Sequence, residues 1–145
     1  MPVQAIMSDE ANNVAVLTDA YRRWHDSRGG SVDHWMSICA ENIQFGSLIR
    51  GAEPRVAYMT GYNARAELGQ YFEGLARDWE MIEYKVNHLV AQQDRVVMLG
   101  HCAWRNKNTG KVVSTPKADS WRFVNGKAVE FYEYFDTAQV HAAAA

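Results

Sequence analysis

The hydrophobic pattern of this chain changes once along its length, near residue 80. Before that point, apolar residues recur three and four positions apart, which is the spacing of an amphipathic helix. After it, runs rich in β-branched and aromatic residues alternate with short turn signals, which is the pattern of consecutive strands. Helices followed by strands indicate an α+β fold, with the helices packed on one face of an antiparallel sheet.

Three helices are expected in the first part of the chain. The first begins after Ser8, a good N-cap residue, and extends to about Arg28, where two glycines stop it. The second and third begin after Ser31 and Asn63, which are also residue types that cap helices. Residues 50–61 carry Gly, Pro and Thr without a clean period, and we expect them to form a loop.

The second part is expected to form a long antiparallel meander within a single domain, 1–145, whose ordered core is about 12–137. The Ala-rich tail at 141–145 is expected to fray. The expected strands, counting one that lies between the second and third helices, are 43–48, 81–90, 95–105, 112–124 and 128–135.

Composition excludes several classes of function. The formal net charge is −2 without a long basic run, so no nucleic-acid or membrane partner is expected. No segment approaches the ~20 apolar residues of a membrane helix, and residues 1–13 lack the pattern of a signal peptide, so a cytoplasmic protein is expected. The two cysteines, Cys39 and Cys102, and the five histidines show no metal-ligand spacing, and there is no phosphate-binding loop. We therefore expect neither a metal nor a cofactor.

The run from Trp121 to Lys127, followed by the run from Phe131 to Thr137, resembles the SnoaL-like branch of the nuclear-transport-factor-2-like superfamily. The order of helices and strands from Val14 onward resembles it as well. The resemblance implies a cone-shaped, cystatin-like fold in which three helices lean on a curved sheet and enclose an apolar small-molecule pocket. Relatives include polyketide cyclases, ketosteroid isomerase and limonene-epoxide hydrolase, so the resemblance implies the fold more than the reaction.

Individual positions can be compared with two of these enzymes. The oxyanion-hole tyrosine of ketosteroid isomerase is similar in position to Tyr21, and its protonated aspartic acid to Asp119, but Ser47 stands where that enzyme has its basic aspartate. In the epoxide hydrolase pattern, an Arg-x-Asp and a further Asp correspond to Lys117, Asp119 and Glu133. Lysine lacks the planar fork of arginine, so this match is chemical and not geometric.

The strand pattern itself makes Asp119 a candidate pocket acid. Lys117, Asp119, Trp121 and Phe123 alternate along one expected strand and therefore share a face. Large aromatic residues on that face favour a core-facing orientation, whereas a solvated Asp119 paired with a surface cation is the alternative.

The orientation of Glu133 depends on one turn. A two-residue turn at 125–126 would place Tyr132 on the Asp119 face, whereas a three-residue loop at 124–126 would place Glu133 there. We favour the longer loop, because it matches the arrangement that the resemblance implies. The neighbours that would accompany Glu133 are Phe131 and Phe135.

A similar argument places His101 in the pocket if residues 108–110 form a three-residue loop; a structural hydrogen bond is the alternative role for this histidine. Tyr21 and Trp24 fit the apolar stripe of the first helix, so they line either the pocket or only the core. The expected substrate-binding residues are Trp24, Leu99, Trp121, Phe131, Phe135 and, from the loop at 50–61, Tyr58.

Two functional hypotheses follow. The first is a cofactor-independent acid/base enzyme for a hydrophobic carbonyl- or epoxide-bearing small molecule, of the isomerase, cyclase, dehydratase or hydrolase type. Asp119 and Glu133 would transfer the proton, His101 would assist, Lys117 would tune the acids, and Tyr21 would donate a hydrogen bond to developing negative charge. The second is a non-catalytic ligand-binding or dimerisation module.

The other face of the last strands is expected to be rich in aromatic residues, more than is usual for a face in water. We therefore expect a homodimer through the outer face of the sheet, as in most relatives. The residues expected on that face are Cys102, Trp104, Arg122, Tyr132 and Tyr134.

Overall fold

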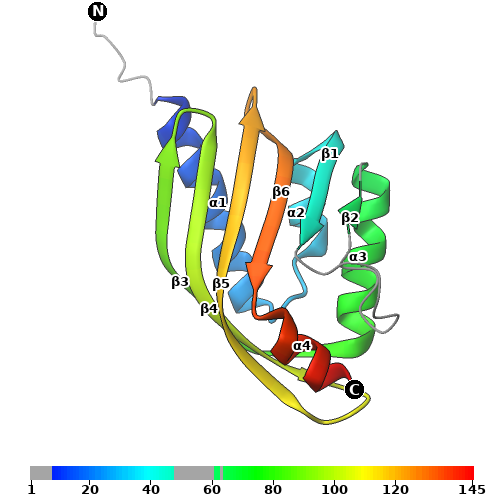
Figure 1. Cartoon of the computed structure of the whole chain (residues 1–145). Coiled ribbons are helices and arrows are strands. Elements are labelled where there is room, and N and C mark those ends of the chain that lie inside the picture. Colours follow the sequence, from blue (N-terminus) through cyan, green and yellow to red (C-terminus); the bar gives the residue numbers. More distant parts are fainter. Residues whose placement is uncertain (1–7, 48–60, 63) are drawn as a thin grey trace, which may run out of the picture.

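The computed structural model describes residues 8–47, 61–62 and 64–145. Three helices lie against one face of a curved sheet, and a fourth lies at its lower end (Figure 1), which confirms the α+β fold class. The helices are α1 (Asp9–Asp26), α2 (Val32–Ile38), α3 (Arg65–Asp78) and α4 (Thr137–Ala144). The strands are β1 (Cys39–Ser47), β2 (Gly61–Tyr62), β3 (Trp79–Gln92), β4 (Arg95–Asn106), β5 (Val112–Val124) and β6 (Lys127–Phe135).

Local sequence signals explain where the helices begin and which face they bury. The Ser8 side chain accepts a hydrogen bond from the Ala11 backbone N–H at 3.2 Å, which caps α1. Leu17, Tyr21 and Trp24 form the buried stripe of α1, as the spacing predicts. The N-cap of α3 is Ala64, without a side-chain cap, and the expected cap Asn63 lies outside the described residues.

The C-terminal tail forms a helix instead of the frayed segment that its composition suggested. Asp136 caps α4 by accepting a hydrogen bond from the Gln139 backbone N–H at 3.1 Å. Val140 and Ala143 are buried, so alanine's high helix propensity is combined with burial of one helix face. These two contributions outweigh the usual fraying of a chain end.

The sheet has the order β2-β1-β6-β5-β4-β3, and β3 to β6 form the expected antiparallel meander. β1 pairs with β6 in parallel, with Phe45 opposite Phe131. β3 is irregular between Val86 and His88, opposite Gly100, where an added Cβ would collide with the Lys85 carbonyl oxygen. This irregularity increases the local bend of the strand, and it requires glycine at position 100.

The turn between β5 and β6 differs from the expected three-residue loop. Val124 pairs with Lys127 across a two-residue turn in which Asn125 and Gly126 both have positive φ, 48° and 80°. An irregularity then follows, because Arg122 pairs with Glu130 while Phe123 pairs with Ala128. The extra residue shifts the register by one position and brings Glu133 opposite Asp119. The expected loop was wrong, but the expected orientation of Glu133 is confirmed.

The loop between β4 and β5 also differs from the expected loop, and here the expected orientation of the strand residues is wrong as well. The Asn106 side chain accepts hydrogen bonds from the Asn108 and Thr109 backbone N–H groups at 2.9 and 3.1 Å, and the Asn106 N–H donates to the Lys111 carbonyl. The loop is therefore one residue longer than expected, and Met98 lies opposite Asp119.

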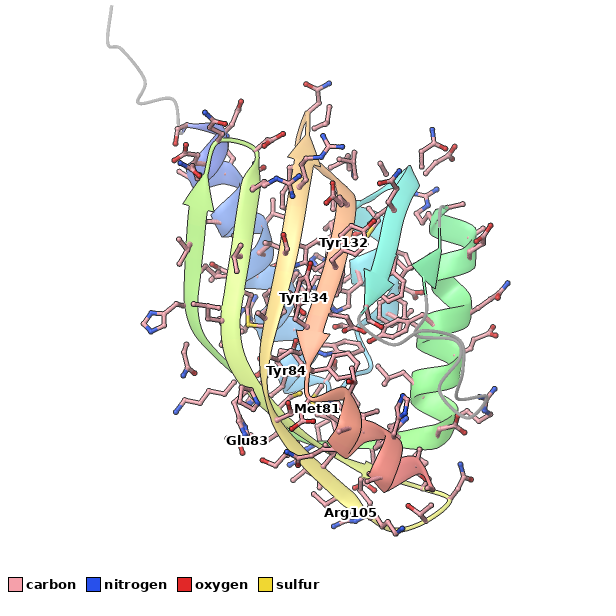
Figure 2. The ribbon with its side chains drawn as sticks, viewed as in Figure 1. Met81, Glu83, Tyr84, Arg105, Tyr132 and Tyr134 are labelled. Carbon is pink, nitrogen blue, oxygen red and sulfur yellow. The ribbon has the colours of Figure 1, made fainter. Side chains whose placement is uncertain are left out.

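This register reverses the expected faces of β4. Leu99 is 41% exposed, and His101 Nε2 lies 3.0 Å from the Ser114 hydroxyl on the convex face, so the inward orientation expected for both residues is wrong. Cys102 is buried and Trp104 half-buried, and both line the interior instead of the outer face. Tyr132 and Tyr134 do lie on the convex side of β6 (Figure 2).

Candidate functional site

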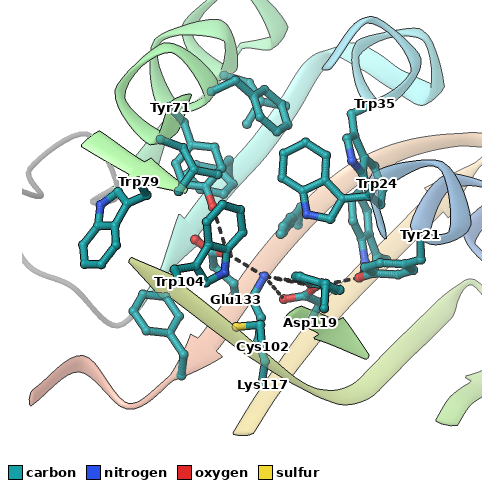
Figure 3. A pocket seen from close by; sticks show the side chains of 18 of the residues that line it. Tyr21, Trp24, Trp35, Tyr71, Trp79, Cys102, Trp104, Lys117, Asp119 and Glu133 are labelled. Atoms are coloured by element: carbon teal, nitrogen blue, oxygen red, sulfur yellow. Dashed lines mark hydrogen bonds and ion pairs between the residues drawn. The ribbon is translucent and has the colours of Figure 1, made fainter. Parts of the chain in front are cut away.

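A cavity of ≈ 80 Å³ lies between the concave face of the sheet and the helices. All five tryptophans of the chain contribute to its lining, and four of them, Trp24, Trp35, Trp79 and Trp104, are labelled in Figure 3. Trp121 stacks between two rings, with its centroid 5.3 Å from that of Trp35 and 4.3 Å from that of Phe131. Such a lining favours a flat, apolar ligand.

One charged cluster interrupts this apolar wall. Lys117 and Asp119 are two residues apart on β5 and so share its concave face, and Glu133 lies opposite Asp119 on β6. Lys117 Nζ lies 3.2 Å from Asp119 Oδ1 and 3.0 Å from Glu133 Oε2. The two acids are 1% and 2% exposed, so the lysine bridges two carboxyl groups inside the protein (Figure 3).

Three tyrosines from three other elements hold the acids. Tyr21 of α1 donates a hydrogen bond to Asp119 Oδ2 at 2.6 Å, and Tyr84 of β3 donates to the same oxygen at 3.2 Å. Tyr71 of α3 donates to Glu133 Oε2 at 3.2 Å. Asp119 is thus held by two phenols, and Glu133 by one.

The hydroxyl of Tyr21 uses its only proton within the protein. It donates to Asp119 and accepts a hydrogen bond from the Trp121 indole N–H at 2.9 Å. The Tyr21 proton is therefore directed at Asp119, and this geometry makes Tyr21 a residue that holds the acid in place.

Two carboxyl oxygens of cavity-lining residues are buried and receive no hydrogen bond from any described residue, Asp119 Oδ1 and Glu133 Oε1. Asp119 Oδ1 is close to Lys117 Nζ, but their contact is ionic and lacks the angles of a hydrogen bond. Buried polar atoms are normally paired, so these two oxygens are the natural acceptors or donors for a bound molecule.

The cluster holds one cation and two acids. Burial raises the pKa of Glu133, and the charge of Asp119 adds to the rise, although Lys117 opposes it. Burial alone would lower the pKa of Lys117, but Asp119 and Glu133 raise it well above its usual value. One ammonium lies against two carboxyl groups, so ionisation of Glu133 is less favourable here than in water.

The three tyrosines of the cluster are neutral hydrogen-bond donors. Burial raises the pKa of Tyr21, Tyr71 and Tyr84 well above the ordinary phenol value, and the neighbouring carboxylates raise it further. Ionising a phenol beside these acids would add another buried negative charge.

The structure brings together many of the residues that the sequence suggested. Tyr21, Lys117, Asp119 and Glu133 meet in one cluster, and the expected aromatic residues line the cavity around it. Among the described residues, His101 and Leu99 are not part of the lining, and Tyr58 lies outside the described residues. Four of the residues expected to bind substrate line the cavity: Trp24, Trp121, Phe131 and Phe135.

Sequence reasoning missed Tyr71 and Tyr84. Tyr71 belongs to the apolar stripe of α3, so its burial was predictable but its bond to an acid was not. Met81 and Tyr84 both turn inward although they are three residues apart, because β3 is irregular between Met81 and Glu83. Strict alternation along a strand cannot place both residues on one face.

The described residues contain no group of three or more His, Cys, Asp or Glu side chains that could hold a metal ion. The concave cluster has two carboxyl groups, and an ammonium lies between them.

Comparison with known proteins places the chain in a family. The family model of the SnoaL-like domain matches residues 17–131, so the chain belongs to the SnoaL-like domain family. Its fold is that of the nuclear-transport-factor-2-like proteins.

Three solved structures illustrate this similarity. An NTF2-like protein of unknown function from Burkholderia pseudomallei has a TM-score of 0.80 at 22% identity, over 94% of this chain and 98% of its own. A putative SnoaL-like polyketide cyclase from Jannaschia has a TM-score of 0.75 at 14% identity, over 97% and 96%. TerC, co-crystallised with polyporic acid, has a TM-score of 0.76 at 16% identity, over 92% and 98%.

A search of curated proteins returned no match to this sequence. In the part of the chain that the structure describes, no helix is both long enough and apolar enough to cross a membrane.

Proposed function

We propose that the protein is a cofactor-independent acid/base enzyme that acts on a hydrophobic carbonyl- or epoxide-bearing small molecule. The observation that carries this proposal is Glu133: a buried carboxyl group with a raised pKa in the lining of an aromatic cavity, whose Oε1 receives no hydrogen bond from any described residue. A neutral carboxylic acid next to a hydrophobic ligand is suited to donate a proton to a developing oxyanion.

Two neighbours of Glu133, Lys117 and Asp119, assist the proton transfer. When Glu133 gives its proton to a substrate oxygen, Lys117 at 3.0 Å stabilises the carboxylate that forms. Asp119, held by Tyr21 and Tyr84, keeps Lys117 protonated and in place. Glu133 then regains a proton from the substrate carbon or from an attacking water, which restores the site after an isomerase, cyclase, dehydratase or hydrolase reaction.

Two structural neighbours support a small organic ligand with rings. One is a putative polyketide cyclase, and the other was crystallised with polyporic acid. The tryptophan-lined cavity of this chain offers the corresponding flat apolar walls.

The test is turnover of cyclic ketones and epoxides by the wild-type protein and by Glu133→Gln and Asp119→Asn, after native mass spectrometry has been used to identify any co-purified ligand. The amide introduced by Glu133→Gln cannot exchange a proton as the acid does, so we expect turnover to fall on the order of 10²–10⁴-fold. The double variant should fall little further than the worse single variant. Full activity in Glu133→Gln would contradict the proposal.

A non-catalytic binding module is the second candidate, because the tyrosines and Lys117 already engage both acids. In that case the same substitutions would lower the free energy of unfolding by roughly 1–3 kcal/mol and leave ligand affinity nearly unchanged. Melting temperature and turnover measured on the same four proteins separate the two functions.

We also propose that the protein is a homodimer through the convex face of the sheet. Leu99 and Tyr134, 41% and 44% exposed, flank the half-buried Ala118 on this face. Lysine substitutions at Leu99 and Tyr134 should give a monomer by sedimentation at micromolar concentration. Lysine at Val112, which is exposed at the far end of β5, should not. A monomeric wild-type protein would contradict this proposal.

A further inference from the structure

A second cavity, of ≈ 210 Å³, lies directly beside the first. It is bounded by the end of α1 and the glycines that follow, by the end of α3, and by residues of β3 and β4. The two cavities share five lining residues, so only side chains separate them. The shared residues are Trp24, Phe72, Leu75, Trp79 and Trp104.

Gly29 lies beside two of the tryptophans in this separating wall. Gly29 has φ +82°, and a Cβ there would lie 3.6 Å from a ring carbon of Trp24 and 3.6 Å from one of Trp104. The two indole centroids are 6.3 Å apart, so the tryptophans contact each other above the glycine. Trp104 is half-buried, whereas Trp24 is buried, so Trp104 is the part of the wall that solvent reaches.

The outer cavity carries an excess of positive charge. Arg28 and Lys107 line it, and each donates a hydrogen bond to a backbone carbonyl: Met81 O at 3.4 Å and Ala76 O at 2.9 Å. No carboxylate of the described residues lies within ion-pair distance of either cation. The acid that lines this cavity, Glu80, lies 3.8 Å from Arg105 and is therefore already paired.

The inner cavity offers an anion no such excess, since its one lysine already lies against the carboxyl groups of Asp119 and Glu133. An anionic group would be attracted by the outer pair of cations and would find no unpaired cation in the inner cluster. The charge distribution therefore favours one orientation of a bound molecule, with an anionic end in the outer cavity.

We propose that the outer cavity is a subsite for the carboxylate end of a ligand whose apolar, reactive body occupies the inner cavity. The substrate class is thus a hydrophobic monocarboxylate, long enough to pass Trp104. This inference rests on the proposed function for the inner cavity and specifies the substrate class of that site.

The probes are naphthylalkanoates of graded chain length and their uncharged methyl esters, with binding measured by isothermal titration calorimetry. Both cations are exposed, so we expect a modest preference for the acid, about 3- to 10-fold in Kd at low salt. The preference should be largest at one chain length, because the carboxylate must reach past the wall. It should shrink in about 0.5 M salt.

The decisive variant is the double substitution Arg28→Gln with Lys107→Gln. It should abolish the preference for the acid and leave ester binding unchanged. Lys111→Gln is the matched control, because Lys111 is also an exposed lysine bonded to a backbone carbonyl, Ala145 O at 2.8 Å, but it does not line the cavity. Melting temperatures should show that all variants remain folded.

Three results would overturn the inference, and they are distinguishable from failure of the proposed function. If the ester binds and the acid binds no better, the subsite is wrong while the inner ligand site stands. If the acid preference survives the double substitution, the carboxylate binds elsewhere. If neither probe binds, the subsite and the hydrophobic ligand class of the proposed function both fail.

Discussion

Charged side chains on the two faces of the sheet differ in their exposure to water. On the concave face, Asp119 and Glu133 are buried and the Lys117 side chain is only 11% exposed, and the tyrosines that bond to the acids come from α1, α3 and β3. On the convex face, Arg95 and Arg122 pair with Glu130, and all of these partners keep some contact with water. The same kinds of charge therefore meet in two different dielectric environments.

This difference decides what each cluster can do. Exposed ion pairs are screened and contribute little to stability, so the convex pairs are suited to solubility and to a protein interface. The buried cluster cannot be neutralised by solvent, so its protons and its lysine depend on one another. Substituting one charged residue on each face is the most direct way to test this difference.

The largest effect is expected for Lys117→Met. This substitution leaves two buried acids without their cation, and we expect the free energy of unfolding at pH 7 to fall by about 3–5 kcal/mol. Glu133 loses the neighbour that lowers its pKa, so its pKa rises further and the deficit should grow as the pH increases from about 4 to 7. Urea denaturation at several pH values measures both quantities.

Arg122→Met is the control on the convex face. Arg122 also contacts two acids, Glu130 at 3.2 Å and Asp94 at 3.8 Å, but these pairs are partly exposed. Its loss should cost no more than about 1 kcal/mol. Equal losses in the two variants would remove the distinction between the faces.

A smaller effect is expected for Gly100→Ala. The new methyl group would meet the Lys85 carbonyl, so β3 must move or lose its irregularity. We expect a loss of about 1–3 kcal/mol in the free energy of unfolding. Because Tyr84 lies on the same strand, its bond to Asp119 should weaken as well. Gly69→Ala, at an open helical position, should instead be neutral or stabilising. A fully stable Gly100→Ala protein would show that the irregularity of β3 is not required.

The sequence predicted the elements of this fold well, because hydrophobic period and turn residues are local signals. It predicted the faces of the strands less well, because one residue of register exchanges them. Glu133 reached the concave face through an irregularity near Arg122 that compensated for a shorter turn. His101 reached the convex face because the Asn106 side chain stabilises a longer loop. An alternation pattern records neither the added residue in one strand nor the side-chain hydrogen bonds of a loop.

The pH dependence of stability sharpens the role of Glu133. Its pKa in the folded protein is raised above the ordinary value of 4.5, so the stability linked to its neutral form is complete below that value and decreases as the pH rises through the folded pKa. A glutamine side chain cannot ionise, so the variant Glu133→Gln should gain stability relative to wild type as the pH rises from about 4.5 through the folded pKa of Glu133. A constant stability difference across this range would show that Glu133 has no raised pKa.

The smallest effect is expected for His101→Ala, and its smallness is informative. His101 contacts the Ser114 hydroxyl on the convex face and belongs to a β4 position that turns away from Lys117, Asp119 and Glu133. Removal of this half-exposed side chain should change the free energy of unfolding by less than about 0.5 kcal/mol. Turnover should stay within about twofold of wild type, because a residue that does not reach the substrate cannot move its proton.

Cys102→Ser, one position along the same strand, is the comparison, since Cys102 is buried and lines the cavity. If His101→Ala lost turnover while Cys102→Ser kept it, the register of β4 against β5 would have to be shifted by one residue, and the histidine would return to the site.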